Sequence, residues 1–98
     1  MANKDREKID LTHDELMELW EGVYWAGRKY ELKGEKYEQV DKVNTSEFSD
    51  GESFDYIIKR ESDGKFFKFN VWETPREGYV FCDKFLIEVK QVTKIAYE

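Results

Sequence analysis

The chain has 98 residues, a formal net charge of -6 and an aromatic content of 16%. A chain of this length can form one domain around one hydrophobic core, and its aromatic content argues against a disordered protein. The single cysteine, Cys82, excludes an internal disulfide and a cysteine-cluster metal site. We expect it to be a small buried hydrophobe in a short strand.

The first ten residues are polar and charged, and we expect them to be flexible. They lack the apolar core of a secretory signal, and no segment of the chain approaches the length of a membrane span. The sequence therefore predicts a cytoplasmic protein that is not embedded in a membrane. Its expected organisation is a flexible N-terminus at residues 1–10 and a single domain at residues 11–98.

A helix is predicted to begin after Thr12. Thr12 and Glu15 have the spacing of a capping box, and Leu11 and Leu16 have that of a hydrophobic staple. Apolar residues then recur at helical spacing and form one stripe. The stripe consists of Leu16, Leu19, Trp20, Val23, Tyr24 and Gly27.

The sequence allows two ends for this helix. In the longer version, which we favour because the stripe continues through Tyr24, the helix runs to Ala26 and Gly27 caps it. In the shorter version Gly22 ends the helix, and residues 23–32 are extended.

Strand signals follow from residue 30 onward. We expect a short strand at Tyr30–Leu32, a turn at residues 33–35 and a second strand at residues 36–43. Residues 45–53 have loop composition, with Asp50-Gly51 as a turn.

The strongest local signal is a β-hairpin between Phe54 and Glu73. Its two strand-like segments are joined by Asp63-Gly64, a pair typical of two-residue hairpin loops. That loop would place Lys59 directly opposite Lys68. It would also give the hairpin one apolar core face, formed by Phe54, Tyr56, Ile58, Phe67, Phe69 and Val71. A three-residue loop is the alternative, but it would turn Lys68 inward.

The remainder of the chain predicts more strands. The only proline, Pro75, lies in an expected loop at residues 74–78. A short strand at residues 79–82, a turn and a long alternating strand at residues 85–97 follow. If this last strand is a sheet edge, it could pair with a second copy in a homodimer.

These elements predict an α+β fold, in which one N-terminal amphipathic helix packs on a four- to five-stranded antiparallel sheet. The main alternative is a strongly curled sheet that closes toward a partly open, SH3-like barrel.

No catalytic constellation is evident in the sequence. The single histidine, His13, lies in the first predicted helical turn, and there is no Walker loop, dinucleotide fingerprint or glycine-rich phosphate cradle. Asp50, Glu52 and Asp55 lie close together but lack the spacing of an EF-hand. We therefore predict a protein that is not an enzyme and that uses no metal or other cofactor.

One candidate binding surface is the outer face of the hairpin, which mixes apolar and basic side chains. It consists of Ile57, Lys59, Phe66, Lys68 and Trp72. Such a face can form the centre of a protein interface or stack nucleic-acid bases, unless another segment covers it. The net charge of -6 favours a protein partner over nucleic acid.

A second candidate surface is an acidic face of the helix. Between Ile9 and Gly27 the chain has acidic residues but no Lys or Arg. The predicted face consists of Asp14, Glu15, Glu18 and Glu21. It could attract a basic partner or mimic phosphates, although acids near a helix N-terminus are also typical of a solvated face.

Two segments carry a resemblance to known proteins: YIIKRESDGKFFKF at residues 56–69 and LIEVKQVTKIAYE at residues 86–98. They resemble a class of small bacteriophage-encoded proteins that combine an amphipathic N-terminal segment with a strand meander. The resemblance covers roughly the C-terminal half and includes no catalytic motif, so no residue roles follow from it. It implies a protein made in the cytoplasm of an infected bacterium that binds or inhibits a host or phage macromolecule.

Overall fold

The computed structural model describes residues 6–25, 27–48, 51–74, 78–81 and 84–90. In these residues one helix and seven strands follow one another along the chain. They are β1 (Lys8–Asp10), α1 (His13–Gly22), β2 (Lys29–Leu32), β3 (Glu35–Phe48), β4 (Gly51–Arg60), β5 (Phe66–Thr74), β6 (Gly78–Phe81) and β7 (Phe85–Val89).

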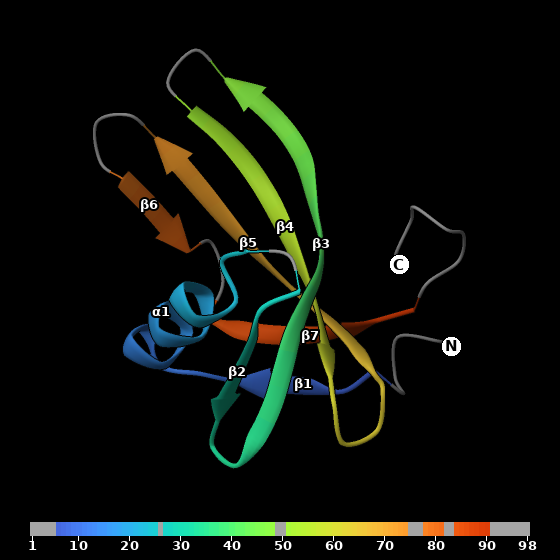
Figure 1. Cartoon of the computed structure of the whole chain (residues 1–98). Helices are drawn as coiled ribbons and strands as arrows, with labels where there is room; N and C mark the ends of the chain where they lie inside the picture. Colours follow the sequence, from blue (N-terminus) through green and yellow to red (C-terminus); the bar gives the residue numbers. More distant parts are fainter. Residues whose placement is uncertain (1–5, 26, 49–50, 75–77, 82–83, 91–98) are drawn as a thin grey trace.

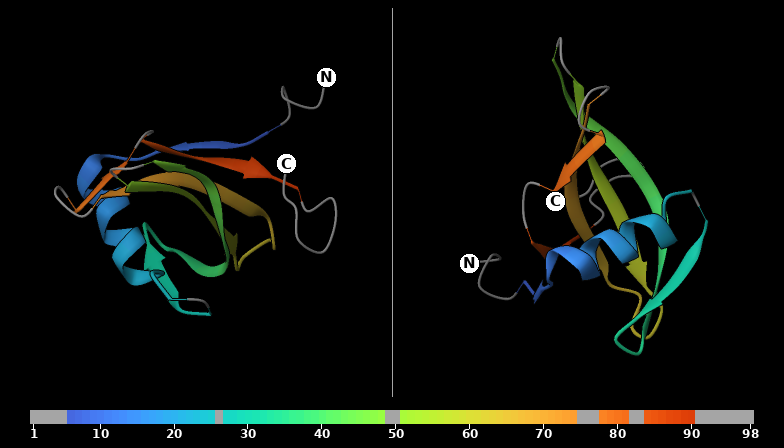
Figure 2. Two further views of the ribbon diagram at one scale, coloured as in Figure 1. Left: turned by 90° about the horizontal axis from the view of Figure 1, so that it is seen from above. Right: turned by 90° about the vertical axis from the view of Figure 1, so that its left-hand side faces the viewer.

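The strands form one antiparallel sheet in the order β1-β7-β5-β4-β3-β2. One side of β5 is shared: β7 pairs with Phe66–Lys68, and β6 pairs with Val71–Thr74. The sheet curls into a half-barrel, and α1 lies across its concave side (Figures 1 and 2). Because α1 follows β1 and precedes β2, it also connects the two outer strands of the sheet order.

The predicted helix on a four- to five-stranded sheet is therefore wrong, whereas the SH3-like alternative fits the curled sheet. Residues 45–53 were expected to be a loop, but most of them extend β3 and β4. The β3–β4 pairing has register shifts between Gln39 and Asp41 and between Asn44 and Ser46. Such bulges bend a strand and increase its twist, which explains why this long hairpin curls rather than lying flat under the helix.

The core fills the inside of the half-barrel. Five of the six apolar residues predicted for the inner hairpin face are buried there, namely Tyr56, Ile58, Phe67, Phe69 and Val71. Phe54 packs against them and is partly buried. The helix stripe adds Leu16, Leu19, Trp20 and Val23 to the same cluster. The inner hairpin face is thus confirmed, and so are four of the six positions of the helix stripe, whereas Tyr24 is partly buried and Gly27 is exposed.

The hairpin turn is longer than predicted. Arg60 donates its backbone N–H to the carbonyl of Lys65 (2.8 Å), and Gly64 donates to the carbonyl of Arg60 (2.8 Å). Lys59 consequently lies opposite Phe66, so the predicted pairing of Lys59 with Lys68 is wrong. The register differs by two residues from the predicted one, and because side chains alternate with a period of two, each remains on its predicted face.

The helix begins as predicted and ends earlier than we favoured. The side chain of Thr12 accepts from the Glu15 N–H (3.1 Å), and the Glu15 carboxylate accepts from the Thr12 N–H (2.9 Å), which completes the capping box. The helix ends at Gly22, as in the shorter version, although among the described residues 23–32 only Lys29–Leu32 form a strand. A Cβ at Gly22 would clash with ring atoms of Tyr30, so the glycine is needed where β2 packs against the helix.

Two expectations about the ends of the chain also change. Residues 8–10, predicted to be flexible, form β1 and pair with β7. Within the described residues β7 lies between β1 and β5, so Phe85–Val89 is not the sheet edge that we expected, and the homodimer stays a prediction. Cys82, Pro75 and residues 91–98 lie outside the described residues, as does Asp50.

Candidate functional site

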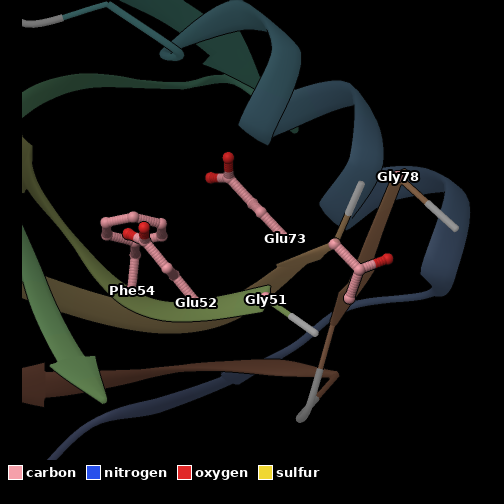
Figure 3. Close-up of a pocket in the computed structure, with 6 residues that line it drawn as sticks. Gly51, Glu52, Phe54, Glu73 and Gly78 are labelled. Carbon is pink, nitrogen blue, oxygen red and sulfur yellow. The ribbon is translucent and has the colours of Figure 1, made fainter. Parts of the chain in front are cut away.

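The candidate site is the end of the half-barrel where β3, β4 and β5 extend beyond α1 (Figure 1). We call it the mouth and define it by the side chains of Tyr24, Lys42, Glu52, Phe54, Tyr56 and Glu73. A pocket of about 360 Å³ opens here. Its lining residues are Gly51, Glu52, Phe54, Glu73, Thr74 and Gly78 (Figure 3).

Strand alternation places the mouth residues on one face. Glu52, Phe54 and Tyr56 occupy every second position of β4 and therefore share the concave side. In Figure 3 the side chains of Glu52, Phe54 and Glu73 rise from β4 and β5 toward the same space. Lys42 lies opposite Tyr56 because of the first register shift in β3; in an unshifted strand Asp41 would take that position. The bulge therefore places a cation in the mouth where an acid would otherwise lie.

The ammonium group of Lys42 is surrounded by aromatic rings. Its Nζ lies 4.3 Å from the ring centroid of Phe54, 5.2 Å from that of Tyr56 and 5.5 Å from that of Tyr24. It is also 3.6 Å from a carboxylate oxygen of Glu73. The mouth thus stabilises an ammonium group by cation–π contacts and one carboxylate.

Tyr56 joins the core to this carboxylate. Its hydroxyl donates to Glu73 Oε2 at 2.7 Å. Burial, and secondarily this hydrogen bond, raise the pKa of Tyr56, so the hydroxyl keeps its proton at neutral pH. The indole N–H of Trp20 is buried nearby and has no acceptor within hydrogen-bond distance in the described part of the chain.

The aromatic side chains of the mouth are continued by Trp25, which lies on the protein surface. The ring centroid of Trp25 lies 5.0 Å from that of Tyr24, in an edge-to-face arrangement, and Trp25 is 66% exposed. The buried side chain of Gln39 donates to the Tyr24 carbonyl (3.2 Å) and so fixes this segment to β3. Trp25 therefore forms an anchored but exposed apolar rim beside the mouth.

The mouth carries more negative than positive charge. Glu52 lies directly opposite Glu73 on the neighbouring strand, an arrangement in which like charges repel. Glu52 accepts a hydrogen bond from the side chain of Asn44 (3.1 Å), but no ion pair joins it to a cation in the described residues. In the part of the chain that the structure describes, Lys42 is the one cation paired with either carboxylate, and its partner is Glu73.

The predicted outer hairpin face is only partly available. Ile57 is 2% exposed and contributes no contact surface. Lys68 lies 3.8 Å from Asp55, which offsets its charge. Lys59 is exposed, Phe66 is half-buried and Trp72 is 37% exposed on this outer face. The structure therefore places the five predicted residues on one face but does not expose them together.

The predicted acidic helix face is likewise divided. Glu15 serves the capping box and pairs with Lys33 at 3.1 Å. A hydrogen bond to Glu18 raises the pKa of Tyr30, so this acid also has a partner. Asp14 and Glu21 are exposed. Two of the four acids thus support the fold, and Glu21 lies close in sequence to the exposed Trp25.

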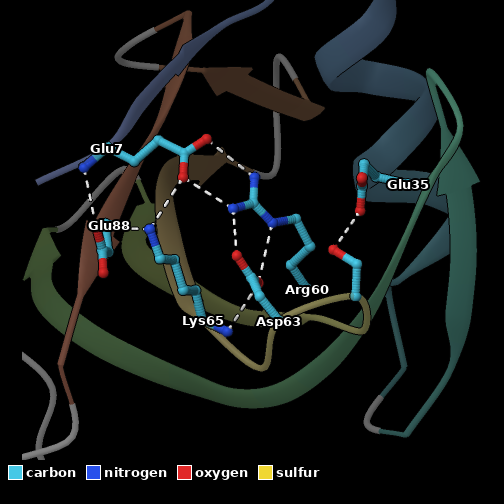
Figure 4. Close-up of polar contacts among 7 residues, drawn as sticks. Glu7, Glu35, Arg60, Asp63, Lys65 and Glu88 are labelled. Atoms are coloured by element: carbon cyan, nitrogen blue, oxygen red, sulfur yellow. Dashed lines mark hydrogen bonds and ion pairs between the residues drawn. The ribbon is translucent and has the colours of Figure 1, made fainter.

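A second polar cluster lies at the opposite end of the concave side, and we call it the Arg60 cluster (Figure 4). It consists of Glu7, Arg60, Asp63, Lys65 and Glu88. Arg60 donates to both carboxylate oxygens of Glu7 (2.8 and 3.0 Å) and to both of Asp63 (2.6 and 3.1 Å). Its hydrogen bonds lower the pKa of Glu7 and lower that of Asp63 to about 2. This cluster fastens the segment before β1 to the central hairpin.

The sequence did not reveal the mouth. Phe54 and Tyr56 were predicted as core residues, and Lys42 was assigned to a strand without a bulge. Lys42 faces inward because of the register shift after Gln39. No glycine or proline in this strand marks the bulge in the sequence. Glu73 lies at the end of the predicted hairpin, two positions after the core residue Val71, and this spacing alone could have assigned it to the inner face.

The described residues contain no group of three or more His, Cys, Asp or Glu side chains arranged to hold a metal ion. Nor do they contain a helix that is both long and apolar enough to cross a membrane. No protein-family model matches the chain, and neither the curated proteins nor the solved structures include a match.

Proposed function

We propose that the protein is a non-enzymatic binding protein that recognises another protein through the mouth and the adjacent Trp25. The observation that carries this proposal is the 66% exposure of Trp25 on a segment fixed by Gln39. Tryptophan is enriched among the residues that dominate protein interfaces. Because its segment is held in place, little conformational freedom would be lost on binding.

The neighbouring pocket supports the same proposal. Protein interfaces combine an aromatic anchor with a polar surround that fixes orientation, and the mouth offers aromatic rings together with Lys42, Glu52 and Glu73. In keeping with the resemblance to phage-encoded proteins, we propose a host or phage protein as the partner. The two would meet in the bacterial cytoplasm, and binding would inhibit or redirect the partner.

Nucleic-acid binding by the outer hairpin face is a second candidate function. The exposed Lys59 and the partly exposed Phe66 and Trp72 support it, because aromatic and basic groups together can bind single strands. The net charge of -6 and the acid beside Lys68 count against it.

An affinity pull-down from bacterial lysate tests both functions. Tagged protein would be incubated with lysate, with and without nuclease, and retained proteins identified by mass spectrometry. We expect a protein that is retained after nuclease treatment, lost with Trp25→Ala and kept with the matched variant Trp72→Ala. Recovery that disappears with nuclease and with Trp72→Ala would instead support nucleic-acid binding. A retained protein indifferent to Trp25→Ala would contradict the proposed surface.

A further inference from the structure

The position of Lys42 shows what kind of group the mouth accommodates. An ammonium group already lies among the rings of Tyr24, Phe54 and Tyr56, at centroid distances of 4.3 to 5.5 Å. Aromatic surrounds of this kind are typical of sites that recognise cationic ligands. Here the cation comes from the protein itself.

The charges of the mouth favour an additional or replacement cation. Two carboxylates, those of Glu52 and Glu73, lie opposite each other. Among the described residues Lys42 forms an ion pair with Glu73, and no cation pairs with Glu52. A second cation would relieve their repulsion, whereas an anion would meet two negative charges. A pocket of about 360 Å³ beside them is within the range that holds a small ligand or a single side chain.

The ammonium group of Lys42 is bound less tightly by its neighbours than the guanidinium group of Arg60. The Lys42 side chain is 32% exposed and its ion pair with Glu73 measures 3.6 Å. Arg60 is 12% exposed and makes bonds of 2.6 to 3.1 Å to two carboxylates. Lysine has a flexible stem and a strongly hydrated head, so Lys42 can move its ammonium group into solvent without disturbing β3.

We propose that the mouth binds a lysine or arginine side chain of the partner protein, and that Lys42 occupies this position in the free protein as an internal competitor. The inference rests on the proposed function, since it names the chemistry of the partner at the same surface. The incoming cation takes over the contacts with Phe54 and Glu73 and gains Glu52, which Lys42 does not engage. Arginine is the stronger ligand, because its planar guanidinium stacks on aromatic faces and bonds carboxylates in pairs.

The test is an NMR titration of the full chain with blocked tripeptides. Acetyl-Gly-Arg-Gly-amide and acetyl-Gly-Lys-Gly-amide are the cationic probes, with the Glu and norleucine peptides as controls. We expect the cationic peptides to bind and to shift the Lys42 methylene signals toward solvent values, because these protons leave the ring currents. Lys42→Met should tighten binding by about fivefold, since the competitor is gone. Glu52→Gln and Glu73→Gln should each weaken it by about tenfold.

Lys36→Met is the matched control, because Lys36 is exposed and lies outside the mouth. It should leave peptide affinity within about twofold of the wild type, as a distant surface charge is screened. Unchanged or weaker binding by Lys42→Met would overturn the inference, as would tighter binding of the Glu peptide than of the Arg peptide. Each variant's amide spectrum shows whether it is folded, and Glu52→Gln, at an exposed position, keeps the test valid if Glu73→Gln unfolds.

Failure here is distinguishable from failure of the proposed function. A partner that is lost from the pull-down with Trp25→Ala but indifferent to Lys42→Met and Glu52→Gln would support the binding protein and overturn the cationic ligand. Peptide binding as described, with no protein retained from lysate, would support the site and contradict the proposed class of partner.

Discussion

The two ends of the half-barrel, the Arg60 cluster and the mouth, contain the same kinds of side chain in different arrangements. At the Arg60 cluster a cation lies 4.9 Å from the ring centroid of Phe67 and bonds two carboxylates in pairs. At the mouth a cation lies 4.3 Å from the ring centroid of Phe54 and makes one ion pair of 3.6 Å. A cation, an aromatic ring and carboxylates therefore do not indicate a binding site by themselves. What separates the two ends is whether the charges are balanced by close partners.

At the Arg60 cluster the polar side chains already bond one another, so few of them could bind a ligand. Glu7 also pairs with Lys65 (3.4 Å), and its backbone N–H donates to the Glu88 side chain (2.9 Å). Among the described residues, the mouth has a carboxylate without a paired cation, an adjoining pocket and a neighbouring exposed tryptophan. We interpret the first end as structural and the second as functional, and four measurements can break or sharpen this contrast.

The largest expected effect is the loss of stability in Arg60→Met. Removing a largely buried cation leaves Glu7 and Asp63 without their main partner, and we expect the free energy of unfolding to fall by about 3 kcal/mol. Urea denaturation measures it. Lys65→Met, at a 41% exposed side chain with longer contacts, is the matched control, and it should lose under about 1 kcal/mol. Equal losses in both variants would show that Arg60 is not the centre of the cluster.

The next effect is a loss of stability in acid. The folded-state pKa values of Asp63, about 2, and of Glu7 lie below their ordinary values of 3.8 and 4.5. Groups with a lowered folded-state pKa stabilise the fold fully above the unfolded-state pKa and lose this contribution as the pH falls through the folded-state pKa. The cluster's contribution should therefore be complete above about pH 5 and disappear progressively toward about pH 2. Thermal melts of wild type and Arg60→Met should converge over this range, and parallel curves would contradict the assignment.

A smaller effect is expected for Tyr56→Phe at the mouth. The variant loses the 2.7 Å hydrogen bond to Glu73 but keeps the buried ring. Because the acceptor is a carboxylate that keeps Lys42 as a partner, we expect a loss of about 1.5 kcal/mol in the free energy of unfolding. A double-mutant cycle with Glu73→Gln isolates the coupling. A coupling near zero would show that Glu73 is not held by Tyr56.

The smallest effect is expected for Lys42→Met. Its partly exposed, 3.6 Å ion pair should contribute under about 1 kcal/mol to the free energy of unfolding. Substitution by Met should thus lower the free energy of unfolding strongly at Arg60 but hardly at all at Lys42, as measured by urea denaturation. A loss comparable to that of Arg60→Met would mean that both ends are structural, and the contrast would fail.

The sequence predicted the local chemistry of the fold better than its architecture. The capping box at Thr12 and Glu15 depends on neighbouring residues, and it was confirmed. The inner face of the hairpin was also predicted correctly, although the turn was not, because an error of two residues preserves the alternation of side chains. Such features are encoded within a few residues of one another.

Features that depend on distant contacts were not predictable in this way. Gly22 ends the helix because Tyr30 packs against it, which no helical periodicity reveals. Residues 45–53 have loop composition, yet the sheet extends them as strands. The mouth combines Tyr24, from the segment after α1, with residues of β3, β4 and β5. The position of Lys42 among them depends on a bulge. The candidate site therefore became visible only with the register of the whole sheet.

The pairing of β1 with β7 also has a consequence for how the domain matures during translation. The Glu7 backbone and the Glu88 side chain are joined across 81 positions of sequence. Contacts between such remote segments form slowly, because the intervening chain must first be ordered. A nascent chain on the ribosome has β1 early but lacks its pairing strand until β7 emerges, and until then one side of β5 at Phe66–Lys68 is unpaired. The half-barrel can thus be completed only after β7 has emerged, and the unfinished domain is the form most exposed to chaperones and proteases.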